Sequence, residues 1–507
     1  MSDSRVVLLT GATGFLGRYL LRDLLLSGQR VAVLARDSRG GRAEERIKEL
    51  LNFWGESLGQ RLPGPVLLHG DLTQRGLGLS LADRRWLGRH CQTVLHAAAN
   101  LSFRTTADGE PWTTNVNGTQ ALLRLASELK IPRWHHISTA FVCGKRKGPI
   151  RETDLDHGQA FYNPYEQSKC AAEKCVREAT GICATVYRPS VIVGDSRTGY
   201  TSSFVGFYRF LELAHRLANL EKGPRRLPVR LRLRGDEPCD FVTVDWVSRA
   251  VVELLALPSE HGRTFHLVAR APATARFIQE TAAAAMGIEG IEFVVPTDIG
   301  PSGRLDEMLL EGLQEYWPYV EGTPVFCARN TTAALPHLPS PAIDAGVLRR
   351  LVRFAVASRF GRSPSRGKPV AQATSVPNCS AYFEQVFPEQ ARASNLARAV
   401  GLTTRISFEI HGVGGGQWSC RWEGGDLLYV RRGLDEQAVA TYRTDTATFA
   451  AVVQGRQNPK QAFFEERIAI SGDLESALKL AALFQQFLQE SAAVNVQSAE
   501  TANAAFC

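Results

Sequence analysis

The chain lacks the features that would place it across a membrane or in an oxidising compartment. Its 507 residues contain no stretch near the roughly 18 uninterrupted apolar residues that cross a bilayer, so we expect at most peripheral membrane contact. The ten cysteines form no CxxC pair and no regular framework, which is typical of reduced thiols. The opening residues, MSDSRVVLL, show no charged segment followed by a long apolar one, so no secretory signal is expected. We therefore predict a cytoplasmic protein.

Internal repeats and a large excess of charge of one sign are also missing. The net charge of +8 is mildly basic and favours anionic partners such as phosphorylated cofactors, thioester carriers or lipid headgroups. We predict neither a nucleic-acid partner nor a metal site. The sequence does not indicate the oligomeric state. A chain of this length with 44% hydrophobic residues is too long for one ordinary core and indicates two or three domains.

Short β-rich runs alternate with helical periodicity from Arg5 to about Leu257, as in a parallel sheet covered by helices. Beyond it the alternation decays into longer helical pieces and proline-punctuated loops, a pattern typical of a segment that shapes a substrate cleft. We predict an α/β, Rossmann-like doubly wound parallel sheet over residues 1–365, with a smaller mixed substrate-binding part mainly at 195–365. The predicted strands are residues 6–9, 31–35, 66–69, 93–96, 134–137 and 184–187.

A stretch rich in Gly, Ser, Pro and Arg, GRSPSRGKPVAQATSVPNC, predicts a linker at residues 366–378. Beyond it, the strand-like runs TRISFEIHG, QWSCRW and DLLYVRR are broken by glycines, and helices are predicted at 446–454 and 474–489. This pattern indicates a second, α+β domain at residues 379–490. The polar tail at 491–507 is expected to be disordered.

The stretch TGATGFLG, residues 10–17, follows the first predicted strand and precedes a helical run. Gly11 suits the φ of a tight turn, Gly14 lets a pyrophosphate touch the backbone, and Gly17 lets the helix pack on the strand. The helix N-terminus adds free N–H groups and a positive dipole end. An ordinary strand-to-helix turn can show this spacing, but the context on both sides favours a dinucleotide site.

Arg36 closes the second predicted strand, where an arginine can pair with the 2′-phosphate of NADP and an acidic residue would bind the ribose of NAD. Asp37 follows directly, so NAD remains an alternative cofactor. Arg36 can also be a solvated side chain without contact to the cofactor, which leaves the same alternative. We predict NADPH. GDL at residues 70–72 and HAAAN at 96–100 follow strands at the same edge, and their small residues leave room for adenine and ribose.

Tyr165 and Lys169 are four residues apart in YNPYEQSKCAAEK, hence on one face of a predicted helix. A neighbouring ammonium lowers the pKa of a phenol and makes it a usable general acid, although a surface helical pair can show the same spacing. Upstream, Ser138 and Thr139 end a strand with hydroxyls able to hold a substrate carbonyl oxygen. Asn115 can keep a proton relay in place.

These motifs together resemble the extended short-chain dehydrogenases/reductases. TGATGFLG, GDLT, HAAAN, NVNGT, STAFVCG, YEQSK and RPSVIVGD occur in the order of that family over about half of the chain. Within the superfamily, GDLTQRGLGLSLADRRWL, YEQSKCAAEK and YRPSVIVGDSRTGYTSS are most similar to fatty acyl-CoA reductases and carrier-bound thioester reductases. The resemblance implies NADPH as the cofactor.

The resemblance also implies roles for individual residues. Tyr165 would be the proton donor, Lys169 its partner and ribose ligand, Thr139 the carbonyl holder with Ser138 beside it, and Asn115 the relay residue. Cys143 stands where many members have tyrosine, which would reshape the pocket. The cofactor-binding residues implied are Gly11, Thr13, Gly14, Phe15, Leu16, Gly17, Arg36, Asp71, Leu72, Ala97, Ala98, Lys169, Pro189, Ser190 and Val191.

The reaction implied is NADPH-dependent reduction of a lipid-like carbonyl to an aldehyde or alcohol, with a fatty acyl thioester of CoA or a carrier favoured. Two alternatives stay open: a dehydrogenase of hydroxysteroids, sterols or other lipid alcohols, and a non-catalytic lipid-binding or NADP-sensing protein. Arg230, Arg232 and Arg234 are predicted on one face of a strand. They could contact the phosphates of a CoA or carrier arm, or form a solvated edge.

The second domain is similar to sterol-carrier-protein lipid-transfer domains. ISFEIHGVGGGQWSCRWEGGDLLYVRRG, TFAAVVQGRQNPKQAFF and IAISGDLESALKL follow the order of that family, which implies a twisted sheet and helices around an apolar tunnel for acyl chains or sterols. A tethered lipid-binding domain would raise the effective concentration of a poorly soluble substrate. An amphipathic helix would bury one face against the sheet as part of the core, and the same face would also line the tunnel. The residues of this face are Leu474, Leu478, Ala481, Phe484 and Leu488.

Overall fold

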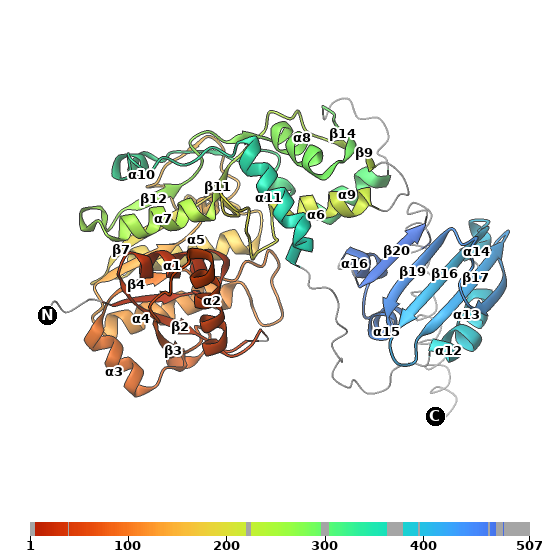
Figure 1. Cartoon of the computed structure of the whole chain (residues 1–507), viewed down its shortest axis with the longest axis horizontal. Helices are drawn as coiled ribbons and strands as arrows, with labels where there is room; N and C mark the ends of the chain where they lie inside the picture. The colour runs from red at the N-terminus through yellow and green to blue at the C-terminus, as the bar shows by residue number, and fades with distance from the viewer. Residues whose placement is uncertain are drawn as a thin grey trace.

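The computed structural model consists of two parts, each built around one β-sheet (Figure 1). The predicted linker at 366–378, the tail at 491–507 and the five residues of the predicted amphipathic stretch lie outside the described residues. In the part of the chain that is described, no helix is both long and apolar enough to cross a membrane. The structure describes residues 6–38, 40–219, 225–295, 304–361, 379–393, 396–464, 467–472 and 480.

The N-terminal part contains a seven-stranded parallel sheet with the strand order β12-β7-β5-β4-β1-β2-β3. The order reverses between β1 and β4, and in such sheets the ligand crevice lies at this switch point. The predicted doubly wound fold and its six predicted strands are confirmed. The strands are β1 Val6–Thr10, β2 Arg30–Ala35, β3 Val66–His69, β4 Cys91–His96, β5 Arg133–Ile137, β7 Cys183–Pro189 and β12 Thr264–Leu267.

Strand β12 was not expected, because the predicted alternation ended near Leu257. Its four residues, TFHL, are too few to show a strand period, and they pair in register with β7 at the sheet edge. The sheet is therefore one strand wider than the sequence pattern indicates.

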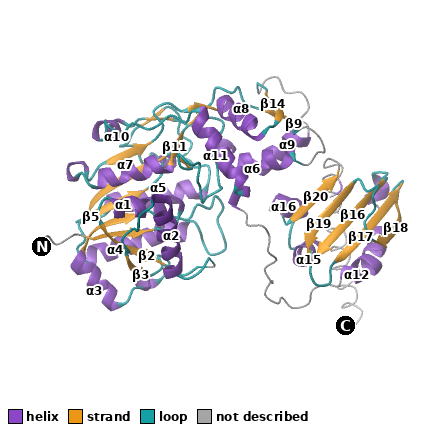
Figure 2. Ribbon diagram, viewed as in Figure 1, coloured by secondary structure: helices purple, strands orange, loops and turns teal. Residues whose placement is uncertain are grey.

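Helices cover both faces of this sheet, so its strands are continuous apolar runs rather than alternating ones (Figure 2). Val7 and Leu9 of β1 pack on one side, and Val6 and Leu8 pack on the other. The first side is covered by α1 Phe15–Leu26, α2 Ala43–Leu58 and α7 Val244–Leu255. The second is covered by α3 Leu81–His90, α4 Thr119–Glu128 and α5 Pro164–Glu178.

The predicted substrate-binding part lies beyond the carboxyl ends of the strands (Figure 1). Its main elements are α6 Phe207–Ala218, β9 Arg226–Leu231, α8 Ala275–Met286, β14 Glu289–Phe293, α9 Arg304–Leu313 and α11 Ala345–Ala357. Two small pairs tie it to the rest of the N-terminal part: β6 Pro149–Ile150 with β15 Val325–Phe326, and β8 Val191–Val193 with β11 Phe241–Thr243. A third pair, β10 Pro238–Cys239 with β13 Ala273–Thr274, lies within it. The short helix α10 Arg329–Ala334 follows β15.

The prediction that Arg230, Arg232 and Arg234 share one strand face is wrong. Strand β9 ends at Leu231, so Arg232 and Arg234 lie beyond it. Arg230 pairs with Asp306 of α9 through Nη2 and Oδ2 at 3.2 Å. This arginine therefore joins two elements of the substrate-binding part instead of facing solvent with its neighbours.

The C-terminal part is a five-stranded mixed sheet with the order β18-β17-β16-β19-β20. β16 and β19 are parallel and the other pairs are antiparallel. The predicted strands and the predicted helix at 446–454 are confirmed. The elements are α12 Cys379–Ala381, α13 Phe387–Ala393, α14 Leu396–Ala399, β16 Thr404–His411, β17 Gly416–Glu423, β18 Asp426–Arg432, β19 Ala440–Asp445, α15 Thr446–Val453, α16 Pro459–Phe464 and β20 Ile468–Gly472.

Aromatic side chains form the core of the C-terminal part. Phe383 stacks on Trp418 with ring centroids 4.7 Å apart and lies 5.3 Å from the ring of Phe449. Phe408 packs against the same group, at 5.1 Å from Phe383. Rigid rings on the sheet, on α15 and on the segment between α12 and α13 thus hold the layers together.

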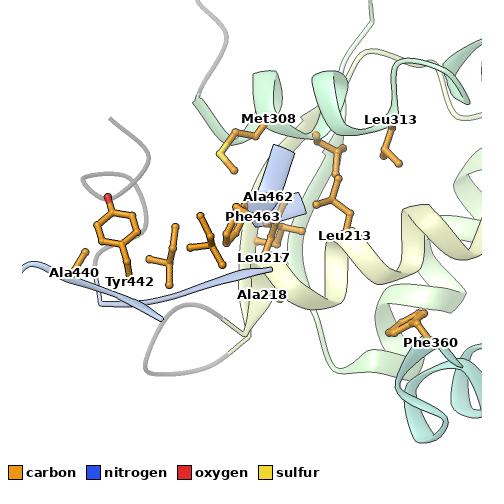
Figure 3. Close-up of a cluster of buried hydrophobic side chains, with 14 of the residues drawn as sticks. Leu213, Leu217, Ala218, Met308, Leu313, Phe360, Ala440, Tyr442, Ala462 and Phe463 are labelled. Atoms are coloured by element: carbon orange, nitrogen blue, oxygen red, sulfur yellow. The ribbon is translucent and has the colours of Figure 1, made fainter. Parts of the chain in front are cut away.

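The two parts touch through α16 and α6. The Nη2 of Arg216 donates to the carbonyl of Phe463 at 2.6 Å, and its guanidinium lies over the Phe463 ring at 5.2 Å. Apolar side chains of α6, α9 and α16, among them Leu217 and Met308, belong to one buried cluster (Figure 3). Helix α6 therefore carries contacts to the C-terminal part on one side, while its other side faces the cavity described below.

Candidate active site

One cavity of about 430 Å³ joins the glycine loop to the predicted catalytic pair. Because the loop after β1, the end of β5, helix α5 and the end of β7 all meet at the carboxyl edge of the sheet, residues far apart in sequence line the same space. The predicted site residues on its wall are Gly14, Phe15, Leu16, Gly17, Ala97, Ser138, Thr139, Tyr165, Lys169, Pro189, Ser190 and Val191.

The glycine loop has the geometry of a phosphate cradle. Gly11 has a φ of +75°, and a Cβ there would lie 2.6 Å from the Ala98 nitrogen. A Cβ on Gly17 would lie 1.9 Å from the Gly11 carbonyl oxygen, so this approach of helix to strand requires glycine. The first turn of α1 begins after Gly14, and its leading N–H groups have no carbonyl partner within the helix. These residues fit a dinucleotide cofactor.

The predicted adenosine end lies at β2 and β3. Arg36 pairs with Asp71 through Nη1 and Oδ2 at 2.9 Å. Burial tends to raise the pKa of Asp71, but hydrogen bonds from Thr73 and Arg36 outweigh it and hold the pKa below its usual value. Asp37 accepts the N–H of Ala43 at 2.8 Å, so it caps the start of α2. One oxygen of its carboxylate is thus engaged by the protein.

Arg46, in the first turns of α2, was missed by the sequence analysis. Its Nη2 donates to the Thr13 hydroxyl at 2.7 Å, and its Nη1 donates to the Arg36 carbonyl at 3.1 Å. A second guanidinium therefore stands between the glycine loop and the end of β2. Nothing in the sequence marks it out, because it lies ten residues after Arg36 in a charged helix.

Two predicted cofactor residues pack rather than line the cavity. The Ala98 N–H donates to Thr10 at 3.2 Å, next to the close approach of Gly11. Leu72 packs against Gly118: a Cβ added at Gly118 would lie 3.0 Å from the Cβ of Leu72. The backbone of Ala98 thus supports the loop at Gly11, whereas Leu72 packs against Gly118 at the start of α4. Cys143 is buried in the turn Ala140–Cys143, whereas Phe141 of the same turn lines the cavity.

Tyr165 lies in the first turn of α5, with Lys169 one turn later. Asn163 starts the helix by accepting the Glu166 N–H at 3.0 Å, and Pro164 occupies the first helical position. Lys169 is buried, its Nζ donates to the Ile137 carbonyl at 2.6 Å, and burial lowers its pKa to about 8 although Glu173 opposes this. The same helix therefore presents both groups to the cavity.

Burial, with the charge of Glu166 beside it, raises the pKa of Tyr165. This direction is opposite to the lowering expected from Lys169, because desolvation of the phenolate outweighs other contributions here. The phenol is consequently protonated at neutral pH, which is the form that a proton donor needs.

The two predicted hydroxyls have different partners. Ser138 donates to Glu173 at 2.7 Å and is held inside a buried network. Thr139 has only a long contact of 3.4 Å to the Pro189 carbonyl and accepts the Phe141 N–H at 3.3 Å. Thr139 can therefore turn its hydroxyl to a substrate oxygen, whereas Ser138 would first have to leave a carboxylate.

Glu173 was also missed by the sequence analysis, although it follows Lys169 by one turn. It is fully buried and binds Arg188 at 2.7 Å between Oε1 and Nη2. Burial tends to raise its pKa, but Arg188, Arg177 and Ser138 outweigh that and keep the pKa below its usual value. This ion pair holds the end of β7, with Pro189 and the following Ser190, against α5, the helix that carries Tyr165 and Lys169.

Asn115 connects two segments instead of contacting Tyr165. It lies in a π-helical turn, Thr113–Gly118, where its side chain receives the Asn100 N–H at 2.8 Å and donates to Ser168 at 2.9 Å. Its carbonyl accepts the Thr119 hydroxyl at 2.6 Å. Asn115 thus joins the loop after β4 to α5 by hydrogen bonds. Any part that it takes in a proton relay to Tyr165 would be indirect.

Tyr319 ties the far wall of the cavity to the catalytic helix. Its hydroxyl lies 2.5 Å from Oε1 of Glu166 and 2.7 Å from Nδ2 of Asn163. Its ring packs on Phe141 at 5.0 Å between centroids. Burial raises the pKa of Glu166 to about 7, with Tyr319 and Tyr162 opposing. Glu166, which directly follows Tyr165, is thus a buried carboxyl group that titrates near neutral pH.

We expect the titration of Glu166 to be visible in stability. The folded state holds this proton more tightly than the unfolded chain, so the free energy of unfolding should fall as pH rises from about 4.5 to about 7 and then level off. Glu166→Gln should remove that part of the slope in urea unfolding measured across this range. The matched change Gln167→Glu, at the exposed neighbour, should leave the slope as it is; an unchanged slope in Glu166→Gln would contradict the assignment.

In the described part of the chain, no group of His, Cys, Asp and Glu is arranged to hold a metal ion. The nine cysteines it contains are free thiols.

Comparisons with known proteins match both parts of the chain. Residues 9–251 match the family described as "Male sterility protein", and residues 383–485 match the "SCP-2 sterol transfer family". The terminal R domain from the myxalamid PKS-NRPS biosynthetic pathway superposes with a TM-score of 0.58 at 29% identity, covering 71% of this chain and 92% of that one.

Two curated relatives are longer proteins. One polypeptide of linear gramicidin synthase from Brevibacillus parabrevis is 32% identical over 53% of this chain, and the match spans 5% of that protein. Nonribosomal peptide synthetase asaC of Aspergillus flavus is 30% identical over 52% of this chain, spanning 26% of that protein. Residues 9–251 thus belong to an extended short-chain dehydrogenase/reductase domain of the family described as "Male sterility protein", and residues 383–485 belong to an SCP-2 sterol transfer domain.

Proposed function

We propose that the protein is an NADPH-dependent reductase of a lipid-like thioester. The observation that carries the proposal is the single cavity that brings the phosphate cradle, Thr139, Tyr165 and Lys169 together and continues as an apolar space. A surface helical pair would not share a cavity with the glycine loop, and a purely lipid-binding protein would not need a buried lysine beside a phenol.

A reduced nicotinamide bound in this cavity would supply the hydride. Thr139 holds the substrate carbonyl oxygen, and Tyr165 gives that oxygen a proton as the carbonyl carbon gains hydride. Lys169, one helical turn away, is placed to bind the ribose and to favour the tyrosinate that forms. The carbon–sulfur bond of the hemithioacetal then breaks, and the departing sulfur takes up the proton that the hydroxyl gives up as the aldehyde forms. Hydride and proton thus convert one thioester into an aldehyde and a thiol.

We propose NADPH over NADH because two guanidinium groups, Arg36 and Arg46, flank the end of β2 while Asp37 is engaged by α2. Arg36→Ala should raise the KM for NADPH about 10- to 100-fold, since a charge-assisted hydrogen bond is worth about 1.5–3 kcal/mol. The KM for NADH should change less than about threefold. Steady-state kinetics with both cofactors measure this, and an equal rise for both would count against a phosphate contact.

The substrate class rests on three observations. The cavity wall beyond Tyr165 is mostly apolar. The match to an R domain from a PKS-NRPS pathway, and to peptide synthetases, supports a carbonyl delivered as a carrier-bound thioester. The SCP-2 domain supports a poorly soluble acyl chain or sterol as the ligand of the C-terminal part. CoA and a carrier protein present the same thioester, and the assay below separates them.

The test is a cofactor-oxidation assay of the full chain with products identified by mass. The substrates are long-chain acyl-CoAs, the same acyl groups on a phosphopantetheinylated carrier, fatty aldehydes, and hydroxysteroids with NADP⁺. We expect NADPH consumption with a thioester and release of aldehyde or alcohol. Turnover of hydroxysteroids alone would establish the alcohol dehydrogenase instead, and tight NADPH binding without any turnover would establish a non-catalytic protein.

A further inference from the structure

The catalytic cavity continues past Tyr165 into the substrate-binding part. Two strands wall it with alternate side chains, Val229 and Leu231 from β9 and Ile291 and Phe293 from β14. Because β9 and β14 are paired in parallel, with Val229 opposite Ile291 and Leu231 opposite Phe293, these side chains form one apolar face.

Two helices close the other sides of this space. α6 contributes residues at helical spacing, including Leu211 and Ala214. α8 contributes Ala275, Ile278, Gln279, Ala282, Ala283 and Met286, whose positions follow the i, i+3, i+4, i+7 pattern of one helix face. Apart from Gln279 of α8, the side chains that these strands and helices contribute are apolar, and such a wall suits an unbranched hydrocarbon chain because it cannot satisfy a row of polar groups.

The direction of α8 gives the space a near end and a far end. The helix starts directly after β13, which pairs with β10, and Asp240 just beyond β10 accepts the hydroxyl of Ser190 at 2.6 Å. The near end therefore adjoins the wall proposed for the nicotinamide. The helix ends at Met286. The carbonyl of Met286 accepts a hydrogen bond at 2.9 Å from Arg225, the residue that directly precedes β9. The far end lies there.

Small side chains occupy the wall near the far end. Ala282 and Ala283 are 4% and 6% exposed, and Met286 is 6% exposed, so this end is covered from solvent. From Ala275 to Met286 the helix rises about 16 Å. An extended chain of single bonds advances about 1.2 Å per bond, as a fully extended backbone does, so about a dozen carbons would reach from one end to the other.

We propose that this space is the subsite for the acyl tail of the thioester, and that Ala282, Ala283 and Met286 set the longest unbranched chain it accepts. The inference rests on the proposed function, since the thioester must place its carbonyl at Tyr165. Within the subsite, each methylene added to the substrate should raise kcat/KM about fourfold. The rise should stop near a dozen carbons, where the chain meets Met286.

The experiment measures kcat/KM of the full-length protein for a series of saturated acyl thioesters from four to eighteen carbons. Ala283→Leu should lower kcat/KM for a twelve-carbon chain at least tenfold and leave the four-carbon substrate within about twofold. Met286→Ala should shift the optimum to longer chains, a gain that loss of folding cannot produce. Ala284→Leu, at an exposed position of the same helix, is the matched control and should leave the whole profile unchanged.

The outcomes separate this inference from the proposed function. If the wild type reduces thioesters but its profile is flat, or if neither variant moves the optimum, the tail lies elsewhere and the subsite is wrong. If no thioester of any length is reduced while NADPH binds, the proposed function itself fails. Retention of four-carbon activity in Ala283→Leu shows that the catalytic residues are intact in that variant.

Discussion

Tyr165→Phe is expected to lower kcat by about 10²- to 10⁴-fold, the usual contribution of a positioned general acid. The phenol lines the same cavity as the glycine loop, and burial with Glu166 keeps it protonated. Phenylalanine removes only the hydroxyl and preserves the ring, which packs 6.1 Å from Phe103. The KM for NADPH should stay within about threefold, because Lys169 and the glycine loop are unchanged.

Tyr162→Phe is the matched control for this change. Tyr162 lies three residues earlier, is 43% exposed, and contacts Lys145 through its ring at 5.3 Å. Its hydroxyl should be dispensable, so kcat should stay near the wild-type value. Should Tyr165→Phe retain wild-type turnover while Tyr162→Phe does not, the proton comes from another group and the assignment of the catalytic helix is wrong.

Glu173→Ala is expected to destabilise the N-terminal part by about 3–5 kcal/mol, because it leaves the guanidinium of Arg188 buried without its partner. Both side chains of the pair are fully buried, and Glu173 also binds Ser138 and Arg177. Urea unfolding followed by tryptophan fluorescence and circular dichroism measures the loss. Because the pair clamps β7 to α5, kcat should fall as well.

Two further variants separate the lost charge pair from general damage to α5. Glu178→Ala, at an exposed position of the same helix, should leave the unfolding midpoint unchanged. Glu173→Leu combined with Arg188→Met should recover part of the stability, since replacing both partners by apolar groups removes the uncompensated charge. If Glu173→Ala unfolds at the same urea concentration as Glu178→Ala, the pair does not hold the fold together.

Local features of the sequence were enough to predict six strands of the first sheet, β16, β17 and β18 of the second, the glycine loop and the spacing of the tyrosine–lysine pair. Each depends on a period or spacing within one segment: apolar runs bounded by turns, three glycines between a strand and a helix, and two residues one helical turn apart. β12 shows where this fails, because four residues without a period acquire their identity only by pairing with β7.

The sequence alone determined the fold class and placed the glycine loop after the first strand, since backbone propensity and close-approach glycines act over short distances. The tertiary structure decided the rest. Glu173 and Arg46 look like ordinary surface charges on their helices until β7 and the glycine loop are brought against them. The apolar tail space exists only because α6, α8, β9 and β14 meet, and a cavity is a property of segments that come together, not of any one of them.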